Sequence, residues 1–317
     1  MVPNVRMEIE QQMKNIVLNN GVEMPQHGLG TFLIPKEKLS RTLAEAYEMG
    51  YRQFDTAWRY HNETEIAQAL KENGIHREDV FITTKVNADA LYYFGYWYGK
   101  HSIFNVRSFK SISRAIEESF ENLQTDYVDL FLVHWPWPIY RKMYKELTKY
   151  YKAGRIRAIG VCSCLPPHLE ALKDVSDIVP AVNQFEISPL NTQKQLIQYC
   201  RERGIQVEAM ATLSHFRSNE PRKELTENET IRPIAEKYGK TIPQIIFKWL
   251  LQQDIIIIPK TWNPKYLKQN ISLYDFTLDD TEMALIDSLD KGHFLNYNPY
   301  NAFRGLPRKY KSWDGFK

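Results

Sequence analysis

The sequence predicts an α/β fold made of a single (β/α)8 TIM barrel, with an N-terminal β-hairpin and long loops at the C-terminal face of the barrel. Two observations carry this prediction. Short runs rich in Val, Ile and Phe alternate with helical patterns along most of the chain, which is typical of a parallel sheet with crossover helices. Eight such runs occur in 317 residues, of which 43% are hydrophobic, and this length and composition suit one barrel with a large core.

The expected domain spans residues 1–317 as one unit. Residues 1–14 are expected to form a flexible N-terminal extension, and residues 292–317 a C-terminal substrate loop and tail. In KNIVLNNGVEMP, Asn20 and Gly21 separate two short apolar runs, which is a strong hairpin signal because both residues accept the left-handed conformation of a two-residue turn. We expect this hairpin at the bottom of the barrel.

The eight expected strands are short, rich in β-branched and aromatic residues, and separated by helical patterns. In chain order they are HGLGTF from His27, YRQFD from Tyr51, VFITTK from Val80, DLFLVHW from Asp129, IRAIGV from Ile156, AVNQFEI from Ala181, QVEAMA from Gln206 and IIIIPK from Ile255.

The helices between them are marked by apolar residues at helical spacing and by end signals. Asn62 with Glu65, and Asp279 with Glu282, are interpreted as N-terminal capping pairs, and Gly50 as a C-terminal stop. The apolar faces are Leu39, Leu43 and Ala46 in the first helix, Phe109, Ile112, Ile116, Phe120 and Leu123 in the third, and Met283, Leu285, Ile286 and Leu289 in the last.

Two connections are much longer than the usual few residues. NADALYYFGYWYGKHSIFNV follows Lys85 and gathers aromatic residues from Tyr92 to Tyr98, and SHFRSNEPRKELTENE follows the seventh strand. Both begin at the C-terminal end of a strand, where barrel enzymes build their active sites. We therefore expect both connections at the catalytic face.

The charge balance argues against a nucleic-acid-binding or membrane-surface protein. Forty-one Lys and Arg against 38 Asp and Glu give a net charge of +3, and the one local excess, RGLPRKYKSW, reads as a solvated tail. No segment approaches the roughly 18 apolar residues of a membrane span, and the N-terminus lacks a secretory signal. Three cysteines argue against a disulfide framework. We expect a cytoplasmic protein that is a monomer or a weak oligomer.

Four polar residues near strand ends are the candidates for chemistry. Asp55 ends the second strand and Tyr60 follows it closely, Lys85 ends the third strand, and His134 ends the fourth. Each of these residues alone would be interpreted as a helix cap or as a residue packed in the core. Because the C-terminal ends of barrel strands meet at one mouth, we expect the four side chains to converge there.

Together these residue types suit the reduction of a carbonyl group. A carbonyl that accepts a hydride needs a proton, which the phenol of Tyr60 can donate if a neighbouring cation lowers its pKa from about 10. Lys85 would supply this cation and Asp55 would hold Lys85 protonated. His134 would donate a hydrogen bond to the substrate oxygen.

Several motifs, in a fixed order over nearly the whole chain, resemble the aldo-keto reductase family. They are VLNNGVEMPQHGLGTF, GYRQFDTAWRYHNE, FITTKV, DLFLVHWP, RAIGV, VNQFE and IPKTWNPKYLKQN. The resemblance implies a barrel enzyme that binds NADPH without a Rossmann fold, with Asp55, Tyr60, Lys85 and His134 at the catalytic tetrad positions. The GLG near Gly28 agrees, since it does not continue as G-x-G-x-x-G.

The resemblance also implies the cofactor positions, with some departures from the family pattern. Ser163 stands in place of an asparagine that holds the carboxamide, Met210 in place of a tyrosine that stacks on the nicotinamide, Ala211 in place of a serine, and Tyr266 in place of an arginine near the 2′-phosphate. The implied cofactor residues are Gly30, Thr31, Phe32, Asp55, Ser163, Gln184, Met210, Leu213, Lys260, Thr261, Tyr266 and Asn270.

These departures weaken particular contacts without removing the site. A thioether can pack on a ring face, and a serine can make one hydrogen bond where an asparagine makes two. Without the arginine, selectivity for NADPH rests mainly on Lys260, so NADPH is the expected cofactor and NADH stays open.

The implied substrate residues surround the same mouth: Trp58, Trp135, Tyr96, Trp97 and Tyr297. A histidine at position 134 favours carbonyl reduction, because in this family a glutamate there accompanies reduction of a carbon–carbon double bond. The aromatic insert and the segment HFLNYNPYNAF match the family's variable substrate loops. They either line a pocket for a bulky apolar or ring-bearing substrate, or simply pack over the barrel rim.

The resulting prediction is an NAD(P)H-dependent oxidoreductase that reduces an aldehyde or ketone to an alcohol, with Tyr60 as proton donor. The alternative is a cofactor-binding, non-catalytic or regulatory protein, since the family includes ion-channel subunits and lens crystallins. A metal hydrolase is disfavoured and no metal is expected, because the eight histidines show no H-E-x-x-H spacing.

Cys162 and Cys164 flank Ser163 in RAIGVCSCLP. Two cysteines one residue apart on a strand point to opposite sides, which disfavours both a shared metal and a disulfide between them. We expect both to be packing residues.

Overall fold

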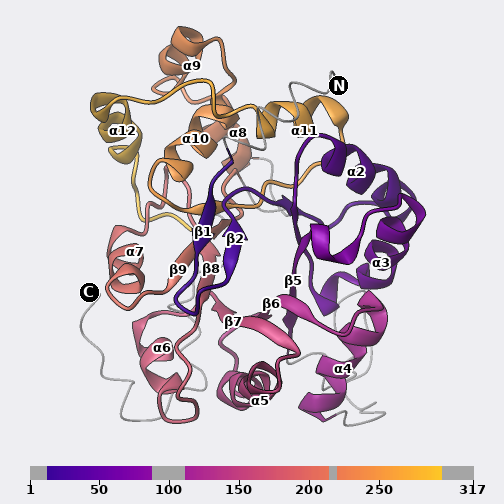
Figure 1. Ribbon diagram of the computed structural model, residues 1–317. Coiled ribbons are helices and arrows are strands. Elements are labelled where there is room, and N and C mark those ends of the chain that lie inside the picture. The colour runs from indigo at the N-terminus through magenta and orange to yellow at the C-terminus, as the bar shows by residue number, and fades with distance from the viewer. Residues whose placement is uncertain (1–12, 88–110, 214–219, 295–317) are drawn as a thin grey trace, which may run out of the picture.

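The computed structural model describes residues 13–87, 111–213 and 220–294 (Figure 1). Eight strands, all parallel, pair in chain order to form one sheet. They are β3 (Leu29–Gly30), β4 (Gln53–Asp55), β5 (Phe81–Val86), β6 (Val128–Val133), β7 (Ile156–Cys162), β8 (Val182–Glu186), β9 (Gln206–Met210) and β10 (Ile256–Ile257). Each lies within or beside a predicted strand.

The sheet closes on itself beside its first strand. His27 pairs with Ile257 in a parallel bridge, and the backbone N–H of Gly28 donates to the Ile257 carbonyl at 2.8 Å. This contact joins the start of the sheet to its last strand. The predicted (β/α)8 barrel is therefore confirmed.

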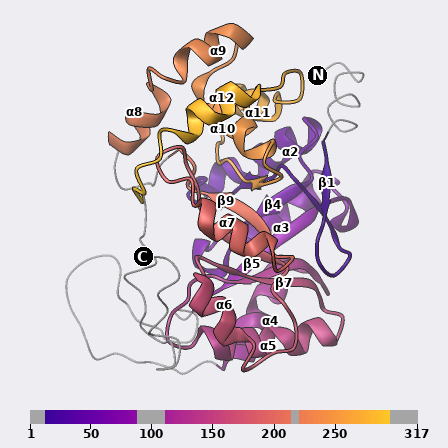
Figure 2. The ribbon, with the colours of Figure 1, turned by 90° about the vertical axis from the view of Figure 1, so that its left-hand side faces the viewer.

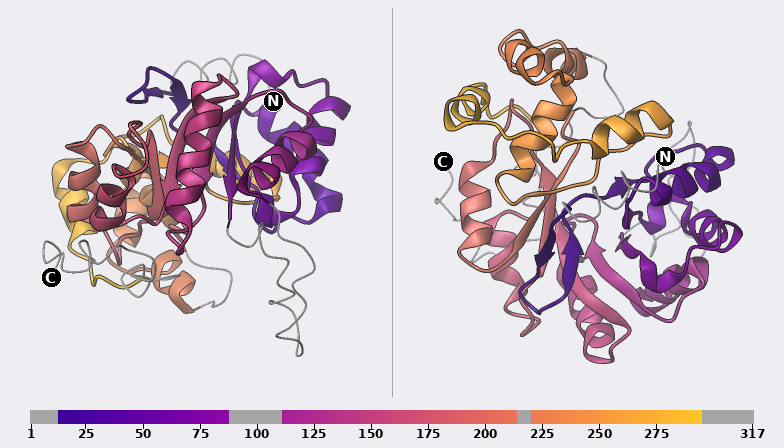
Figure 3. Two further views of the ribbon diagram at one scale, coloured as in Figure 1. Left: turned by 90° about the horizontal axis from the view of Figure 1, so that it is seen from below. Right: turned by 45° about the horizontal axis from the view of Figure 1, so that its top comes forward.

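Helices surround the strands on the outside (Figure 3, right). They are α2 (Lys36–Glu48), α3 (Glu63–Glu72), α4 (Ile112–Leu123), α5 (Tyr140–Lys152), α6 (Pro166–Leu172), α7 (Lys194–Arg201), α8 (Glu220–Thr226), α9 (Arg232–Tyr238), α10 (Ile242–Leu251), α11 (Pro264–Ile271) and α12 (Asp280–Asp287), with the short 3-10 helices η1 (Trp58–Tyr60) and η2 (Arg77–Asp79). No helix in the described ranges is long and apolar enough to cross a membrane.

The predicted hairpin covers one end of the barrel, as Figures 1 and 2 show. Strands β1 (Asn15–Val17) and β2 (Glu23–Pro25) pair antiparallel, and Gly21 in the turn has a φ of +83°. Buried side chains of the hairpin, such as Met24, pack against inward-facing residues of the strands in a small inner core. A larger outer core lies between the strands and the helices.

Of the predicted helix caps and apolar helix faces, some are confirmed and others are wrong. Asp279 and Glu282 form a capping box at the start of α12, as predicted. Asn62 precedes α3 but its side chain makes no cap hydrogen bond, so the predicted pair with Glu65 is wrong. Leu285, which was expected on the apolar face of the last helix and so on the barrel, has a side chain that is 41% exposed, so this prediction is also wrong.

The two ends of the chain are described only in part. Met13 packs against the outer core, and Lys14 forms an exposed ion pair with Asp254. The backbone of His293 donates to the Leu190 carbonyl. The remainder of both predicted end segments, together with the aromatic insert and Phe109, lies outside the described residues, so the predictions for them stay predictions.

Candidate active site

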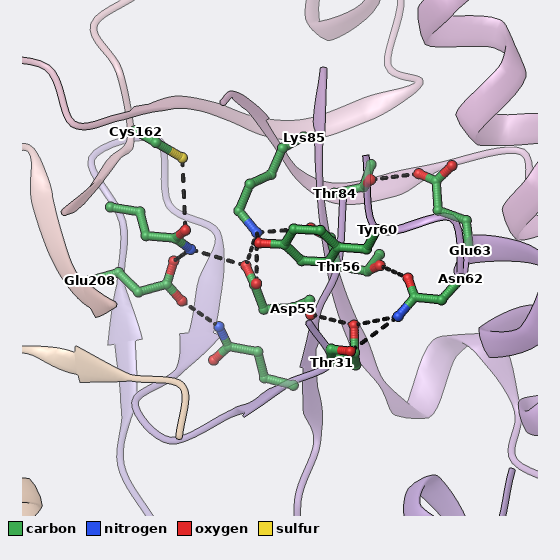
Figure 4. Close-up of polar contacts among 12 residues, drawn as sticks. Thr31, Asp55, Thr56, Tyr60, Asn62, Glu63, Thr84, Lys85, Cys162 and Glu208 are labelled. Carbon is green, nitrogen blue, oxygen red and sulfur yellow. Dashed lines mark hydrogen bonds and ion pairs between the residues drawn. The ribbon is translucent and has the colours of Figure 1, made fainter. Parts of the chain in front are cut away.

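The four predicted catalytic side chains meet at the C-terminal ends of β4, β5 and β6. The Lys85 ammonium donates to both carboxylate oxygens of Asp55, at 2.6 and 2.7 Å, and to the Thr56 carbonyl at 2.8 Å (Figure 4). It also lies 3.4 Å from the Tyr60 hydroxyl. The ring of His134 lies edge to face with the ring of Tyr60, with 5.7 Å between centroids. The structure therefore brings together all four residues.

The loop after β4 is braced by contacts between distant parts of the chain. Thr31 Oγ1 donates to the Asp55 carbonyl at 2.9 Å, and Asn62 Nδ2 donates to Thr31 Oγ1 at 3.2 Å. Thr56 Oγ1 donates to Asn62 Oδ1 at 2.6 Å. Asn62 thus holds the loop that carries Tyr60 instead of capping α3, a role that the local sequence pattern did not reveal.

Burial and charge set the protonation of the predicted catalytic residues. Burial alone lowers the pKa of Lys85, but the adjacent Asp55 carboxylate outweighs it, so the pKa is raised and the ammonium is retained. Burial, and then Lys85, lower the pKa of His134 well below its usual value, so its imidazole is neutral at physiological pH. A neutral imidazole has one N–H to donate and one acceptor nitrogen.

The phenol of Tyr60 is protonated at neutral pH. Burial raises the pKa of Tyr60 to about 12, while Lys85 opposes this rise. The sequence analysis expected Lys85 to lower the pKa of Tyr60 below its ordinary value, and the structure does not show this net lowering. A protonated phenol is nevertheless the form that donates a proton to a reduced carbonyl.

Two buried residues beneath these groups were missed by the sequence analysis. Gln53 Nε2 donates to Glu208 Oε1 at 2.8 Å inside the barrel, and both side chains are fully buried. The signal was present, because side chains alternate along a strand. Gln53 is two residues before Asp55, and Glu208 is two residues before Met210.

Gln184 lies in the barrel interior. Its Nε2 donates to Asp55 Oδ2 at 3.0 Å and to Glu208 Oε2 at 2.6 Å, and its Oε1 lies 3.8 Å from the Cys162 thiol. Both ends of the amide are thus engaged. Because an amide oxygen can accept two hydrogen bonds, Oε1 retains the capacity to accept one from a nicotinamide carboxamide.

The segment after β3 passes along the tetrad. A Cβ on Gly30 would lie 2.8 Å from the Ile258 carbonyl oxygen, so the close approach to the end of β10 requires glycine. Thr31 is fully buried, and its hydroxyl donates a hydrogen bond to the Asp55 carbonyl. The ring of Phe32 lies 4.6 Å from that of Tyr60.

The predicted nicotinamide positions follow β7 and β9. Ser163 is buried, has a φ of +52°, and donates its backbone N–H to the Gln184 carbonyl at 2.8 Å. Met210 ends β9 partly exposed, Ala211 has a φ of +53°, and Leu213 packs partly buried against the outer core. These residues therefore lie at the C-terminal ends of two parallel strands, on the face of the barrel that also carries the tetrad.

The predicted adenosine positions form a cationic surface. The ammonium of Lys260 lies 4.8 Å and that of Lys38 lies 5.5 Å from the ring centroid of Trp262. Burial, and then the positive charge of Arg222, lower the pKa of Lys260. No ion pair joins Lys38, Arg222 or Lys260 to a carboxylate of the described residues. Together they give this surface a positive charge.

The neighbouring residues of this surface come from α11 and the segment before it. Thr261 is buried and accepts a hydrogen bond from the Asn263 backbone at 3.1 Å. Tyr266 is 49% exposed, and Asn270 is partly buried.

Two of the predicted substrate residues are described. Trp135 stacks on His134 at 5.7 Å with an interplanar angle of 13°, and Trp58 lies edge to face with His61 at 5.4 Å. Both tryptophans are partly exposed. Tyr96, Trp97 and Tyr297 lie outside the described residues, so their place at the substrate stays a prediction.

The cysteines have the predicted geometry. Cys162 belongs to the inner core and Cys164 to the outer core, so they point to opposite sides of the sheet. Burial raises the pKa of both thiols well above the usual value. No group of three or more residues suited to hold a metal occurs in the part of the chain that the structure describes.

Residues 28–291 match the Aldo/keto reductase family model. The chain belongs to the aldo/keto reductase family. Glyoxal reductase of Bacillus subtilis is 38% identical over 287 residues, which cover 90% of this chain and 95% of that protein. Methylglyoxal reductase DkgA of Escherichia coli is 36% identical, with 90% and 96% covered. The solved structure of a Gox0644 mutant in complex with NADPH is 32% identical, with a TM-score of 0.79 and 92% and 98% covered.

Family membership and the assembled tetrad agree on the class of protein. This aldo/keto reductase is an oxidoreductase that reduces carbonyl groups with a nicotinamide nucleotide. The alternative of a non-catalytic or regulatory protein is not favoured, because the relatives are enzymes that reduce carbonyl compounds.

Proposed function

We propose that this aldo/keto reductase uses NADPH to reduce small aldehydes and ketones, with Tyr60 as the proton donor. The observation that carries the proposal is the chain of contacts from Asp55 through Lys85 to the Tyr60 hydroxyl, beside the neutral imidazole of His134. This group supplies a proton, a fixed cation and a neutral hydrogen-bond donor at one place.

Each residue has a distinct role in the proposed reaction. Bound NADPH supplies a hydride to the carbonyl carbon. His134 donates a hydrogen bond to the carbonyl oxygen, and Tyr60 transfers its phenol proton to the oxygen as negative charge develops there. Lys85 stabilises the phenolate that is left, and Asp55 keeps Lys85 charged and oriented.

The preference for NADPH over NADH is supported by the charges around Trp262. Lys38, Arg222 and Lys260 supply positive charge there, and the 2′-phosphate is the group that distinguishes NADPH from NADH. Three cations can compensate for the arginine that Tyr266 replaces. A related protein of the same fold is in complex with NADPH.

The substrate class is proposed from the relatives and the described wall of the mouth. Phe32, Trp58 and Trp135 supply partly exposed aromatic surface close to the tetrad. Two relatives are named for the reduction of glyoxal and methylglyoxal. We therefore propose small α-oxo aldehydes as substrates, ahead of bulky ring-bearing carbonyl compounds.

Steady-state oxidation of NADPH and NADH tests this function. Glyoxal, methylglyoxal, a long-chain aldehyde and an aromatic ketone would be compared through kcat/KM with each nucleotide. The proposal predicts turnover that is faster with NADPH and highest with the two dicarbonyls. Nucleotide binding without turnover of any carbonyl would contradict it, and higher kcat/KM values with the aromatic ketone would contradict the substrate class alone.

We also propose the cellular compartment and the oligomeric state of the protein. All three cysteines are buried and none forms a disulfide, which suits the reducing cytoplasm. For the oligomeric state we propose a monomer or a weak oligomer.

A further inference from the structure

Beneath the tetrad, part of the barrel interior carries polar side chains, although such interiors are normally filled by branched apolar residues. Gln53, Gln184 and Glu208 occupy inward positions of β4, β8 and β9, and each is at most 2% exposed. Glu208 is thus a carboxyl group without access to water, and no step of the proposed reaction uses it. Burying a carboxyl group is costly unless hydrogen bonds or charges compensate.

One amide group connects Glu208 to the tetrad. Gln184 Nε2 donates one hydrogen bond to Glu208 Oε2 at 2.6 Å and another to Asp55 Oδ2 at 3.0 Å. Asp55 in turn holds the Lys85 ammonium. The orientation of the Gln184 amide therefore depends on two carboxylates at once, and the charge of Glu208 lies within the network that positions Lys85.

The second partner of Glu208 suits both of its protonation states. Gln53 Nε2 donates to Glu208 Oε1 at 2.8 Å, while Gln53 Oε1 is buried and has no hydrogen-bond partner among the described residues. If Glu208 takes up a proton, the Gln53 amide can rotate by half a turn. Gln53 Oε1 then accepts a hydrogen bond from the Glu208 carboxyl O–H. The Gln53 side chain lies against Gly28, where a Cβ would approach its Cδ to 2.8 Å.

The charged and titratable groups that face Glu208 come from three other strands of the barrel. They are Asp55 of β4, Lys85 of β5 and Cys162 of β7. From β8 it meets the neutral Gln184, and from β10 the apolar Ile256 pairs with it. Burial, and then Asp55, raise the pKa of Glu208 to about 7, against the lowering effects of Gln184 and Lys85. Glu208 therefore takes up a proton more readily than an exposed glutamate does.

We propose that Glu208 is a positioning residue that acts through Gln184 and Asp55 to set the pH range in which Tyr60 donates its proton. Ionised Glu208 places a second negative charge below Lys85, which favours the state with both Lys85 and Tyr60 protonated. Loss of that charge favours release of a proton from the pair. The inference rests on the proposed role of Tyr60 as proton donor.

The test is the pH profile of the full-length Glu208→Gln variant. In carbonyl reduction, kcat/KM falls at alkaline pH when the donor loses its proton. The variant is expected to move this fall to lower pH by about one unit, the size expected for removal of one nearby charge. In alcohol oxidation, its rate at neutral pH should rise. Profiles that superimpose on those of the unmodified enzyme would overturn the proposal.

The matched control is Glu63→Gln. Glu63 is also a buried carboxyl group, held by Thr84 at 2.6 Å and Asn122 at 3.1 Å, but it lies outside the barrel. This variant should lose stability without moving the alkaline fall. An equal displacement in both variants would contradict a specific role of Glu208.

A second variant leaves the carboxyl group in place. Gln53→Met removes one donor to Glu208 and should move the alkaline fall in the same direction by a smaller amount, which keeps the proposal testable if Glu208→Gln does not fold. An unmoved profile in a folded Gln53→Met variant would count against it. Inactivity of the unmodified enzyme toward every carbonyl would refute the proposed function, whereas an active enzyme with unmoved variants refutes only the role of Glu208.

Discussion

Ser163 holds a backbone conformation that serine seldom adopts. Its φ of +52° lies in the left-handed region, directly after the end of β7 and beside the tetrad. Asparagine is several-fold enriched there, and its side chain offers both an amide donor and a carbonyl acceptor. At this position the chain thus combines backbone strain with a weakened hydrogen-bonding group.

Replacing Ser163 by asparagine should reduce the backbone strain and restore the missing hydrogen-bonding group. The Ser163→Asn variant is expected to unfold at a higher denaturant concentration and to bind NADPH about three- to tenfold more tightly, because one added hydrogen bond contributes roughly 1 kcal/mol. Quenching of tryptophan fluorescence would measure the dissociation constant.

Gln193→Asn is the control for the backbone effect. Gln193 has a φ of +55° at the start of α7, outside the proposed cofactor site. This variant should gain stability without tighter NADPH binding. Unchanged NADPH binding by Ser163→Asn would contradict a contact between this position and the cofactor, and weaker binding would contradict the predicted gain.

At the scale of elements, the packing of β7 against its neighbours requires a glycine. A Cβ on Gly160 would lie 2.4 Å from the Val182 carbonyl oxygen and 2.6 Å from Leu132 Cδ2. The first is backbone of β8, which cannot shift without disturbing the ladder. The geometry of the barrel at the site therefore depends on this close approach.

Gly160→Ala is expected to lower the free energy of unfolding by about 3 kcal/mol or more, the upper range for overpacking a core. Chemical denaturation would measure this. Gly239→Ala is the control: Gly239 has a φ of +62° with open space around it, so alanine there should cost only about 1 to 2 kcal/mol. Equal losses in the two variants would contradict the steric account.

The elements also show which features a sequence reveals. Asp279 with Glu282 and Asn62 with Glu65 have the same spacing, yet only the first pair caps a helix. Asn62 is captured instead by Thr56 and by Thr31, which is 31 residues away in the chain. Local spacing cannot show such a tertiary contact, whereas the eight strands followed from local composition and were found.

The candidate site was predictable to a similar extent. The tetrad followed from the family motifs and from strand ends that meet in space. The net rise in the Tyr60 pKa did not follow, because it depends on how burial compares with the charge of Lys85. Strand alternation placed Glu208 and Met210 on one side, but only the fold shows that Glu208 meets Gln184 beneath Asp55.

At the scale of the whole molecule, buried histidines link stability to pH. Burial lowers the pKa of His27 to about 3, and its ring lies edge to face with Tyr51 at 5.3 Å. A histidine in the unfolded chain gains a proton below about pH 6.5, whereas His27 in the fold does not. Its stabilising contribution is therefore present above pH 6.5 and is lost as the pH falls toward 3.

His27→Phe should reduce this loss of stability in acid. The ring contact is kept while the titrating group is removed, so the melting temperature of the variant should fall less than that of the unmodified protein between neutral pH and pH 4. His76→Phe is the matched substitution at an exposed histidine and serves as the control. An unaltered slope in His27→Phe would contradict the account.

The central claim, that Tyr60 gives its proton to the carbonyl from its place beside Lys85, is tested most directly by Tyr60→Phe. The variant keeps the ring contacts with Phe32 and His134 and loses only the hydroxyl 3.4 Å from the Lys85 ammonium. NADPH oxidation with methylglyoxal and NADPH binding would be measured on the same preparation. We predict that kcat falls by at least about 100-fold while the dissociation constant of NADPH stays within about threefold. Turnover equal to that of the unmodified enzyme would contradict the claim.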